Sequence, residues 1–286
     1  MREIKAAKIT GAVVELARRA NFFLRADVLL ALRRAYRFED NKRAKKIIKA
    51  ILDNAAYARK NNLAICQDTG FPIVFVQLGQ DIKIIGDLNS AINKGVAEGY
   101  KKYYLRDSII KDPLLRGKPG FSPCIIHTDI VKGNRIKITL LPKGFGCENK
   151  SQLKMFKPTA GIEEIKKFIV DAVKSAGPDA CPPYVVGVGI GGTADYAGIM
   201  AKQALLTRIT KQNHKLEEDL LRQINKTGIG PMGLGGKTTA LAVKIKKYPT
   251  HIAGLPVSVN ISCHALRSAM VILRPAANRQ GRRIKK

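Results

Sequence analysis

The sequence Cys-Gln-Asp-Thr-Gly at residues 66–70 places a thiol, an amide, a carboxylate and a hydroxyl in consecutive positions. The apolar run 73–78 follows it and has the composition of a buried strand. Reactive polar side chains directly before such a strand are poor core material, because buried polar groups need hydrogen-bond partners. We therefore expect this segment to line a site.

Two further cysteines stand in a similar context. Cys181 precedes two prolines and the apolar run 184–190, and Cys263 follows the run 255–261. Side chains at such junctions can converge from distant segments, and with Cys66 they would supply three thiolates, which suit a [4Fe–4S] cluster with one iron left open. The alternative is three buried structural cysteines, since free cysteine is commonly buried. On spacing alone the structural alternative is favoured, because the gaps of 115 and 82 residues match no compact ferredoxin motif.

Two glycine-rich segments match nucleotide-binding motifs only in part. Residues 187–192 fit the pattern G-x-G-x-x-G, but no second strand with a ribose-binding acid follows at the required distance. Gly236-Lys237-Thr238 resembles the end of a P-loop, but Pro231 stands where that motif needs glycine. Neither NAD nor ATP is expected. The cysteines and histidines also lack the close spacing of a zinc site.

The composition is strongly basic, with 51 Lys and Arg against 22 Asp and Glu, a formal net charge of +29. The basic residues are spread along the chain, aromatic residues make up 6%, and tryptophan is absent. Without a nucleic-acid-binding motif, we do not expect nucleic acid to be the main partner. A generally basic surface, which meets an acidic partner subunit or a salty cytoplasm, is the simpler account.

The N-terminus has no apolar signal core, and no run of eighteen apolar residues could span a membrane. We therefore expect a cytoplasmic protein with no membrane association, whose five cysteines stay reduced. The hydrophobic content of 45% is enough for a real core.

Periodicity predicts a mixed α/β (α+β) fold with a mostly helical N-terminal region, 1–61. We expect a single domain over 1–274 and a basic tail over 275–286. Strands are expected at 73–78, 124–131, 135–141, 184–190, 240–246 and 255–261, with a hairpin at Lys132-Gly133-Asn134. Helices are expected at 2–20, 25–38, 41–61, 87–104, 162–175, 194–206 and 212–225.

Six pieces of the chain, in order from about residue 10 to 268, resemble the iron–sulfur-dependent, class I fumarate hydratases. They resemble still more closely the separate α subunit whose form is shared with L(+)-tartrate dehydratase. The pieces are ICQDTGFPIVFVQLG, LRDSIIKDPL, PKGFGCENKSQL, CPPYVVGVGIGGTADYAGIMAKQAL, NKTGIGPMGLGGKTTALAVKI and HIAGLPVSVNISCHALR.

The resemblance implies a hydro-lyase that reversibly adds water to fumarate, giving (S)-malate, with the open iron of a [4Fe–4S] cluster as Lewis acid. It implies cluster ligation by Cys66, Cys181 and Cys263. It carries substrate contacts over to the positions Gln67, Asp68, Arg106, Gly146 and His251, with catalytic roles for Asp68 and His251. An arginine can bind a carboxylate with two parallel hydrogen bonds, and an aspartate or a histidine can transfer a proton.

Each assignment has a simpler alternative. Asp68 could only cap the following turn, Arg106 could be a solvated charge at a helix end, and His251 could be an ordinary histidine at a strand edge. The sequence also departs from the family pattern twice. Cys147 stands where the loop usually has serine, and a motif that usually ends in two arginines retains only Arg267.

Single-chain members of the family continue into a second domain that completes the substrate pocket. The resemblance therefore implies a separate β subunit, an α2β2 heterotetramer, a C4 dicarboxylate substrate, and no activity of this chain alone. The α subunit of L(+)-tartrate dehydratase is the alternative within the class. A non-catalytic basic protein that binds a cluster or nucleic acid is the alternative outside it.

Overall fold

A computed structural model describes residues 2–209 and 214–275 of the chain. The chain divides into two compact units. Unit 1 contains the described parts of Met1–Ala20, Phe71–Pro142 and Ser268–Lys286, and unit 2 contains those of Asn21–Gly70 and Lys143–Arg267. The predicted mixed α/β class, with its helical N-terminal region, is confirmed. The predicted extent of a single domain, 1–274, stays a prediction, and all but one residue of the predicted tail 275–286 lies outside the described residues.

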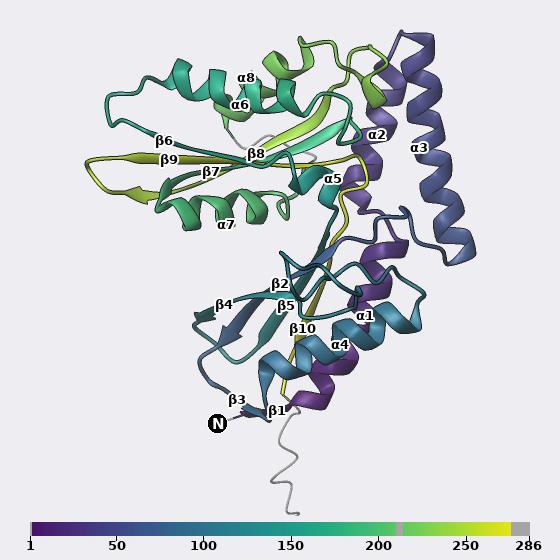
Figure 1. Cartoon of the computed structure of the whole chain (residues 1–286), viewed down its shortest axis with the longest axis vertical. Helices are drawn as coiled ribbons and strands as arrows, with labels where there is room; N and C mark the ends of the chain where they lie inside the picture. The colour runs from purple at the N-terminus through teal and green to yellow at the C-terminus, as the bar shows by residue number, and fades with distance from the viewer. Residues whose placement is uncertain (1, 210–213, 276–286) are drawn as a thin grey trace, which may run out of the picture. The chain divides into compact units, whose positions relative to one another are not determined.

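Unit 1 contains a four-stranded sheet in the order β10-β5-β2-β4 and a two-stranded parallel sheet of β1 and β3 (Figure 1). The strands are β1 (Arg2–Lys5), β2 (Phe71–Gly79), β3 (Ile82–Ile85), β4 (Ile125–Val131), β5 (Ile136–Lys143) and β10 (Ala269–Leu273). Residues 2–5 were expected to begin a helix and are instead a strand. Their pairing with β3 buries Ile4, and helix α1 begins only at Ala6.

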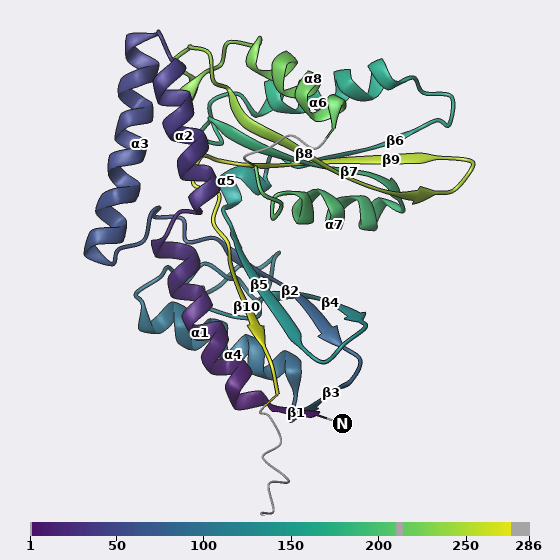
Figure 2. The ribbon, with the colours of Figure 1, turned by 180° about the vertical axis from the view of Figure 1, so that it is seen from behind.

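Helices α1 (Ala6–Phe22) and α4 (Leu88–Lys102) lie side by side in both views (Figures 1 and 2). Two glycines of α4, Gly95 and Gly99, make this close approach possible. A Cβ atom on Gly95 would come within 2.7 Å of the Thr10 carbonyl oxygen, and one on Gly99 within 2.8 Å of the Ala17 Cβ. Glycine is therefore required at both positions by packing.

The predicted hairpin between β4 and β5 is wrong. Both strands belong to one sheet, but β2 lies between them and pairs in parallel with β4. The turn after β4 bonds to the end of β2 instead, with Gly79 N donating to Arg135 O and Asp81 N to Gly133 O. A side chain at Gly79 would meet the Gly133 carbonyl oxygen at 2.3 Å, so this glycine lets the connection cross.

Unit 2 begins with the end of α1 and the antiparallel helices α2 (Ala26–Phe38) and α3 (Lys42–Asn61). Its sheet has the order β6-β9-β7-β8, with α6 (Ile162–Ala176) and α8 (Lys215–Asn225) on one face and α7 (Ala194–Ala204) on the other (Figures 1 and 2). The strands are β6 (Gln152–Phe156), β7 (Tyr184–Gly192), β8 (Ala240–Thr250) and β9 (Leu255–Ser262). The first two residues of the predicted helix 212–225 lie outside the described residues.

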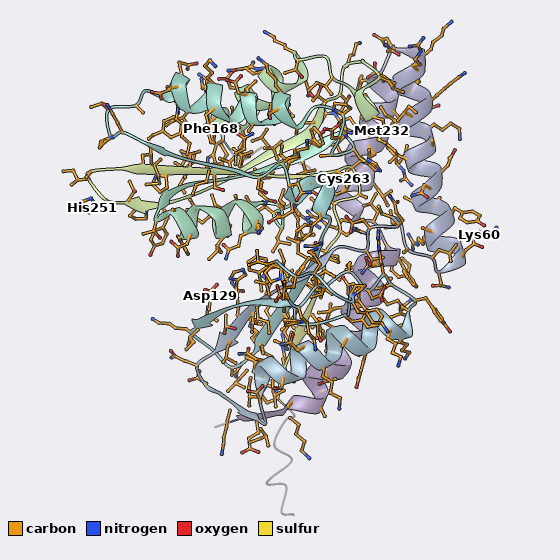
Figure 3. The ribbon with its side chains drawn as sticks, viewed as in Figure 1. Lys60, Asp129, Phe168, Met232, His251 and Cys263 are labelled. Carbon is orange, nitrogen blue, oxygen red and sulfur yellow. The ribbon has the colours of Figure 1, made fainter. Side chains whose placement is uncertain are left out.

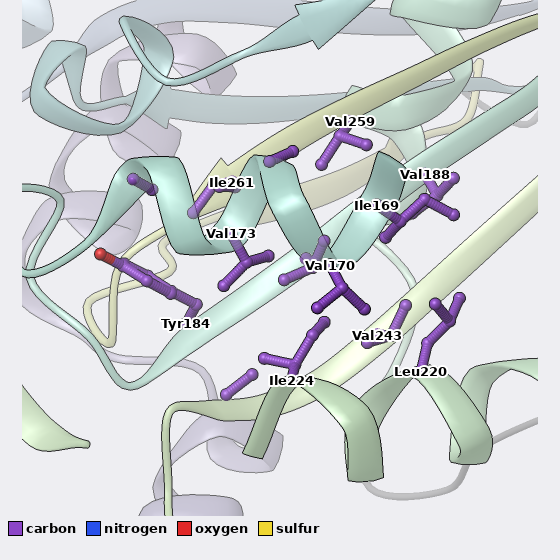
Figure 4. Packing of buried hydrophobic residues seen from close by; sticks show 14 of the residues in the cluster. Ile169, Val170, Val173, Tyr184, Val188, Leu220, Ile224, Val243, Val259 and Ile261 are labelled. Carbon is purple, nitrogen blue, oxygen red and sulfur yellow. The ribbon is translucent and has the colours of Figure 1, made fainter. Parts of the chain in front are cut away.

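The core of unit 2 is an aliphatic cluster between the sheet and helices α6 and α8 (Figure 4). Ile169 and Val173 of α6 pack with Leu220 of α8 and with Val188 and Val259 of the sheet. All five side chains are buried. This face of the sheet positions β7 and β9, whose ends carry Cys181 and Cys263.

The G-x-G pattern at 187–189 has a packing role in the fold. A Cβ atom on Gly187 would lie 2.2 Å from the Ala201 carbonyl oxygen, and one on Gly189 would lie 2.1 Å from that of Ala197. The two glycines therefore allow α7 to lie directly on β7. None of the helices in the described part of the chain combines the length and the apolar content needed to cross a bilayer.

Candidate active site

The loop that holds Cys66 and Asp68 joins α3 to β2 and is fixed within unit 2 by polar side chains. Asn54 donates to the Ile65 carbonyl oxygen at 2.9 Å, and Ile65 N donates to the Asn21 carbonyl oxygen at 3.0 Å. Arg267 Nη2 donates to the Asp68 carbonyl oxygen at 2.6 Å. The backbone on both sides of Cys66 is thus held by partners from α1, α3 and the segment after β9.

The Asp68 carboxylate connects this loop to a second one. Its Oδ1 accepts from Gly70 N at 2.9 Å, and its Oδ2 accepts from Phe145 N at 2.9 Å. Phe145 begins the single-turn helix α5 (Phe145–Glu148), which contains Gly146 and Cys147. Asp68 therefore caps a turn, as its simpler alternative expects, and also joins the first segment to the glycine-punctuated loop. The neighbouring Gln67 is exposed and lies with its Oε1 3.4 Å from Cys66 Sγ.

Cys181 occupies a left-handed backbone conformation, φ +56°, in the turn before β7. Non-glycine residues adopt this region rarely, and such outliers cluster at functional sites. Hydrogen bonds hold the turn on both sides: Cys181 N donates to Pro178 O at 3.1 Å, and the Cys181 carbonyl oxygen accepts from His264 N at 3.4 Å. His264 follows Cys263, so two of the three cysteines lie on neighbouring segments.

The three thiols lie within electrostatic reach of one another in unit 2. Burial raises the pKa of Cys181, and the charges of Cys263 and Cys66 raise it further. Burial also raises the pKa of Cys66, where Arg267 acts in the opposite direction and Cys263 adds to the increase. The fold thus brings Cys66, Cys181 and Cys263 together from segments separated by more than 80 residues.

Cys147, the residue that replaces the usual serine, is buried beside Cys263. Its thiol donates to the Ala180 carbonyl oxygen at 3.4 Å and contacts the Cys263 thiol. This contact lowers the pKa of Cys263 and raises that of Cys147. Cysteine therefore keeps the hydrogen-bonding function that a serine hydroxyl would have here, with a weaker donor.

A buried lysine lies next to this pair. Lys143 is 2% exposed, and its Nζ donates to the Ile261 carbonyl oxygen at 2.8 Å and lies 3.5 Å from Glu148 Oε2. Burial lowers the pKa of Lys143, while the charges of Cys147, Glu148 and Cys263 oppose the decrease. Glu148 is also paired with Lys202 at 2.5 Å. The network fixes α5 against the end of β9.

His251 and Arg106 are not brought to the thiols within unit 2. His251 is exposed at the turn between β8 and β9, where its Nδ1 accepts from Ala253 N at 3.1 Å. Figure 3 shows it at the opposite end of β9 from Cys263, and an eight-residue strand spans about 25 Å. Arg106 is an exposed residue of unit 1, in the loop after α4. The roles predicted for both residues stay predictions.

The donor set can be tested against the implied cluster. Among residues 2–209 and 214–275, no group of three His, Cys, Asp or Glu side chains is arranged to hold a single metal ion. Each thiolate of an iron–sulfur cluster binds a different iron atom, so such thiols lie farther apart than the ligands of one ion. Three partly buried thiols in electrostatic contact fit this group by type and by number.

Sequence reasoning missed Lys143, Asn21 and Asn54. Lys143 is the last residue of the largely apolar strand β5, and it is buried. Its place at the end of an apolar strand is the only feature of the sequence that could have indicated this burial. The asparagines lie within helices, where nothing in the periodicity distinguishes them from solvated polar residues. The thiol of Cys124 lies in unit 1, where burial raises its pKa to about 11.

The thiols lie on loops at the ends of strands in a mixed α/β fold. This arrangement is typical of the class of proteins whose scaffold positions a reactive centre on its connecting segments. Residues 10–272 match the family model described as "Fumarate hydratase (Fumerase)". The chain belongs to this family, the class I fumarate hydratases.

Relatives with assigned names point to one subunit. The chain is 43% identical over 276 residues to the "Putative L(+)-tartrate dehydratase subunit alpha" of Methanocaldococcus jannaschii, covering 92% of this chain and 96% of the relative. It is 29% identical over 256 residues to the L(+)-tartrate dehydratase subunit alpha of Escherichia coli O157:H7, covering 86% and 84%. These findings support an iron–sulfur hydro-lyase α subunit.

Proposed function

We propose that this chain is the α subunit of a hydratase that reversibly adds water to fumarate, giving (S)-malate. The observation that carries the proposal is the convergence of Cys66, Cys181 and Cys263 in unit 2, beside the Asp68 loop of a class I fumarate hydratase family member.

In this proposal, Cys66, Cys181 and Cys263 hold a [4Fe–4S] cluster. When bound, the cluster supplies a Lewis-acid iron for the hydroxyl and carboxylate oxygens of the substrate. The chain's own contribution begins with charge. Arg267 and Lys143, both almost fully buried, place two cations near the thiolates, which compensates the negative charge gathered there.

Asp68 moves or holds the proton in the proposed reaction. Its two oxygens accept from Gly70 N and Phe145 N, which fixes the plane of the carboxylate and leaves its remaining lone pairs for a water or a substrate hydroxyl. Gln67 and the exposed backbone at Gly146 flank it and bind the substrate. Arg106 binds a substrate carboxylate with two parallel hydrogen bonds.

His251 needs a second chain. Because the length of β9 separates it from Cys263, the substrate-binding and catalytic role assigned to it belongs to the site of another copy or subunit. This separation supports an assembly with more than one chain, and the α-subunit names of the relatives support the proposed β subunit and α2β2 form, in which the single chain is inactive. We place the enzyme in the cytoplasm.

L(+)-tartrate dehydratase is the second candidate, because the relatives with assigned names are called α subunits of that enzyme. Both reactions remove or add water at a C4 dicarboxylate, so the same α-subunit residues serve either.

The experiment is anaerobic reconstitution of the chain with iron and sulfide, alone and with a candidate β subunit. We expect a brown chain, with cluster absorbance that Cys181→Ala abolishes and Cys124→Ala retains. Activity toward fumarate and L(+)-tartrate, measured side by side in the assembled protein, then decides the substrate. Cluster binding by Cys181→Ala would contradict the ligand set, and fumarate hydration by the pure chain would contradict the need for a partner.

A further inference from the structure

Helices α2 and α3 carry a concentrated basic surface. Together they contain ten Lys and Arg residues and two acidic residues, whereas α6 and α8 contain five basic and six acidic residues. The basic residues of α6 and α8 are mostly paired, as in Lys166 with Asp219 and Lys167 with Asp171. The excess charge of unit 2 is thus unevenly distributed over its helices.

Most of the basic side chains of α2 and α3 have no acidic partner. Lys49 pairs with Asp53 at 2.6 Å, and Asp27 pairs with Arg25, just before α2. The other nine have no carboxylate within 4 Å among the described residues: Arg33, Arg34, Arg37, Lys42, Arg43, Lys45, Lys46, Arg59 and Lys60. Such a surface fits a partner with many negative charges. Lys60 marks its end on α3 (Figure 3).

Exposed aromatic rings lie among these charges. Phe38 is 59% exposed, with the Arg34 guanidinium 6.0 Å and the Arg37 guanidinium 5.9 Å from its ring centre. Tyr57 on α3 is 63% exposed. Exposed rings beside arginines are the elements on which single-stranded nucleic acids stack their bases.

A hollow of about 610 Å³ adjoins Phe38 within unit 2. Apolar residues of α2 and α8 line it, and Arg34, Asn225 and Thr238 supply polar groups at its wall. A cavity of this size accepts a small aromatic molecule, and a nucleobase has that size and mixed character. Glu218, also in the wall, is the one feature that would repel a phosphate.

We propose that the α2–α3 surface binds a single-stranded nucleic acid such as RNA, with the phosphates on the lysines and arginines and a base in the hollow beside Phe38. An acidic protein partner is the alternative, and the hollow beside Phe38, with its mixed polar and apolar wall, favours a base over an acidic side chain. The inference does not depend on the proposed hydratase function. RNA would be an additional partner, beyond the main function argued from the sequence.

The test is fluorescence anisotropy of the full chain with a labelled single-stranded oligoribonucleotide, over a series of salt concentrations. The triple variant Lys42→Glu, Arg43→Glu, Lys46→Glu should lower the salt slope by about 2, because each phosphate contact to a single strand contributes about 0.7. The matched control is Lys111→Glu, Lys118→Glu, Lys132→Glu, three exposed lysines of unit 1 with the same charge change. Equal losses in the two triples would overturn the proposal.

Two further variants test the base site, one through stacking on Phe38 and the other through the charge of Glu218. Phe38→Ala, at an exposed position, should weaken binding about tenfold, and Glu218→Gln should tighten it. RNA binding unchanged in Phe38→Ala, or competition by polyglutamate as effective as that by unlabelled RNA, would overturn the proposal and indicate an acidic protein partner. Equal binding of a DNA duplex would also overturn it, because paired bases cannot stack on the rings.

Discussion

The backbone carbonyl oxygen of Cys181 lies 3.1 Å from Nδ1 of His264 and also accepts from the backbone N–H of His264 at 3.4 Å. The turn that carries one proposed cluster ligand is thereby fastened to the residue that follows another. His264→Ala removes the ring contact and keeps the backbone bond. We expect the reconstituted chain to lose its cluster absorbance several times faster in the presence of a chelator. His214→Ala, at an exposed position before α8, is the control, and equal loss rates in the two variants would contradict the positioning role.

Asp68 is expected to be needed for activity beyond its effect on stability. In Asp68→Asn, an amide nitrogen replaces one of the two oxygens that accept from Gly70 N and Phe145 N. The free energy of unfolding should fall by about 1.5 kcal/mol, measured by urea denaturation. Asp87→Asn, at the exposed start of α4, keeps an oxygen that accepts from Ser90 N, so it should leave both the stability and the hydration activity of the assembled enzyme intact. If Asp68→Asn is as active as Asp87→Asn, Asp68 has only its capping role.

Asp27 should make stability depend on pH. Burial would raise the pKa of this carboxyl, but the hydrogen bonds and charge of Arg25 outweigh it and hold the pKa below its ordinary value. A carboxyl group whose pKa is lower in the folded chain than in the unfolded chain stabilises the fold at pH values above its unfolded-state pKa. This stabilisation is lost as the pH falls through the folded-state pKa. Asp27→Asn should therefore be less stable than the natural chain by about 2 kcal/mol at neutral pH. The difference should disappear in strong acid, and a constant difference at all pH values would contradict this assignment.

Lys244 and Glu217 form an ion pair in unit 2, with both side chains 1% exposed and 3.0 Å between the charged atoms. Lys244→Met leaves the Glu217 carboxylate in an apolar core without this cation. We expect a loss of about 3 kcal/mol in urea denaturation. Adding Glu217→Met should restore much of the loss, because the cost lies in the uncompensated charge. A double variant that loses the sum of the two single effects would contradict a coupled pair.

The separation of His251 from the thiols can be tested by complementation. Cys181→Ala and His251→Ala should each give inactive homogeneous assemblies. Co-expression of the two α-chain variants with the β subunit should restore part of the activity, because one copy supplies the histidine and the other the thiols. No recovery, despite mixed assemblies seen by mass spectrometry, would place His251 in the site of its own chain or outside the chemistry.

The sequence predicted the helices and the buried strands of unit 2 well, because their hydrophobic periodicity is strong and local. The sequence-based prediction was wrong where a strand pairs with another strand that lies far away in the sequence. The turn Lys132–Asn134 has the composition of a hairpin, yet β2, more than fifty residues earlier, takes the place between the two strands. Strand β1 was missed because four residues give too short a pattern, and its burial depends on β3.

For the candidate site, the sequence predicted the proposed cluster ligands better than the residues that hold them in place. Cys66, Cys181 and Cys263 were identifiable by type, by context and by family resemblance. The contacts that hold them come from Arg267, Asn21, Lys143 and Cys147, whose burial depends on the whole of unit 2. Lysine and arginine side chains are usually exposed, and the burial of any one of them depends on partners that tertiary packing brings together. The sequence alone therefore does not identify the buried ones.

The contact between the Asp68 carboxylate and Phe145 N has a consequence for gene design. Segment 71–142 leaves unit 2 after Gly70 and returns at Lys143, and the two ends of unit 2 at this break are held close by a 2.9 Å hydrogen bond across a gap of 77 positions. Insertions are tolerated where chain ends lie together. The same geometry makes the reverse operation feasible: a linker of a few residues from Gly70 to Lys143, with residues 1–20 and 268–286 removed as well, leaves unit 2 and all three thiols on one shortened polypeptide.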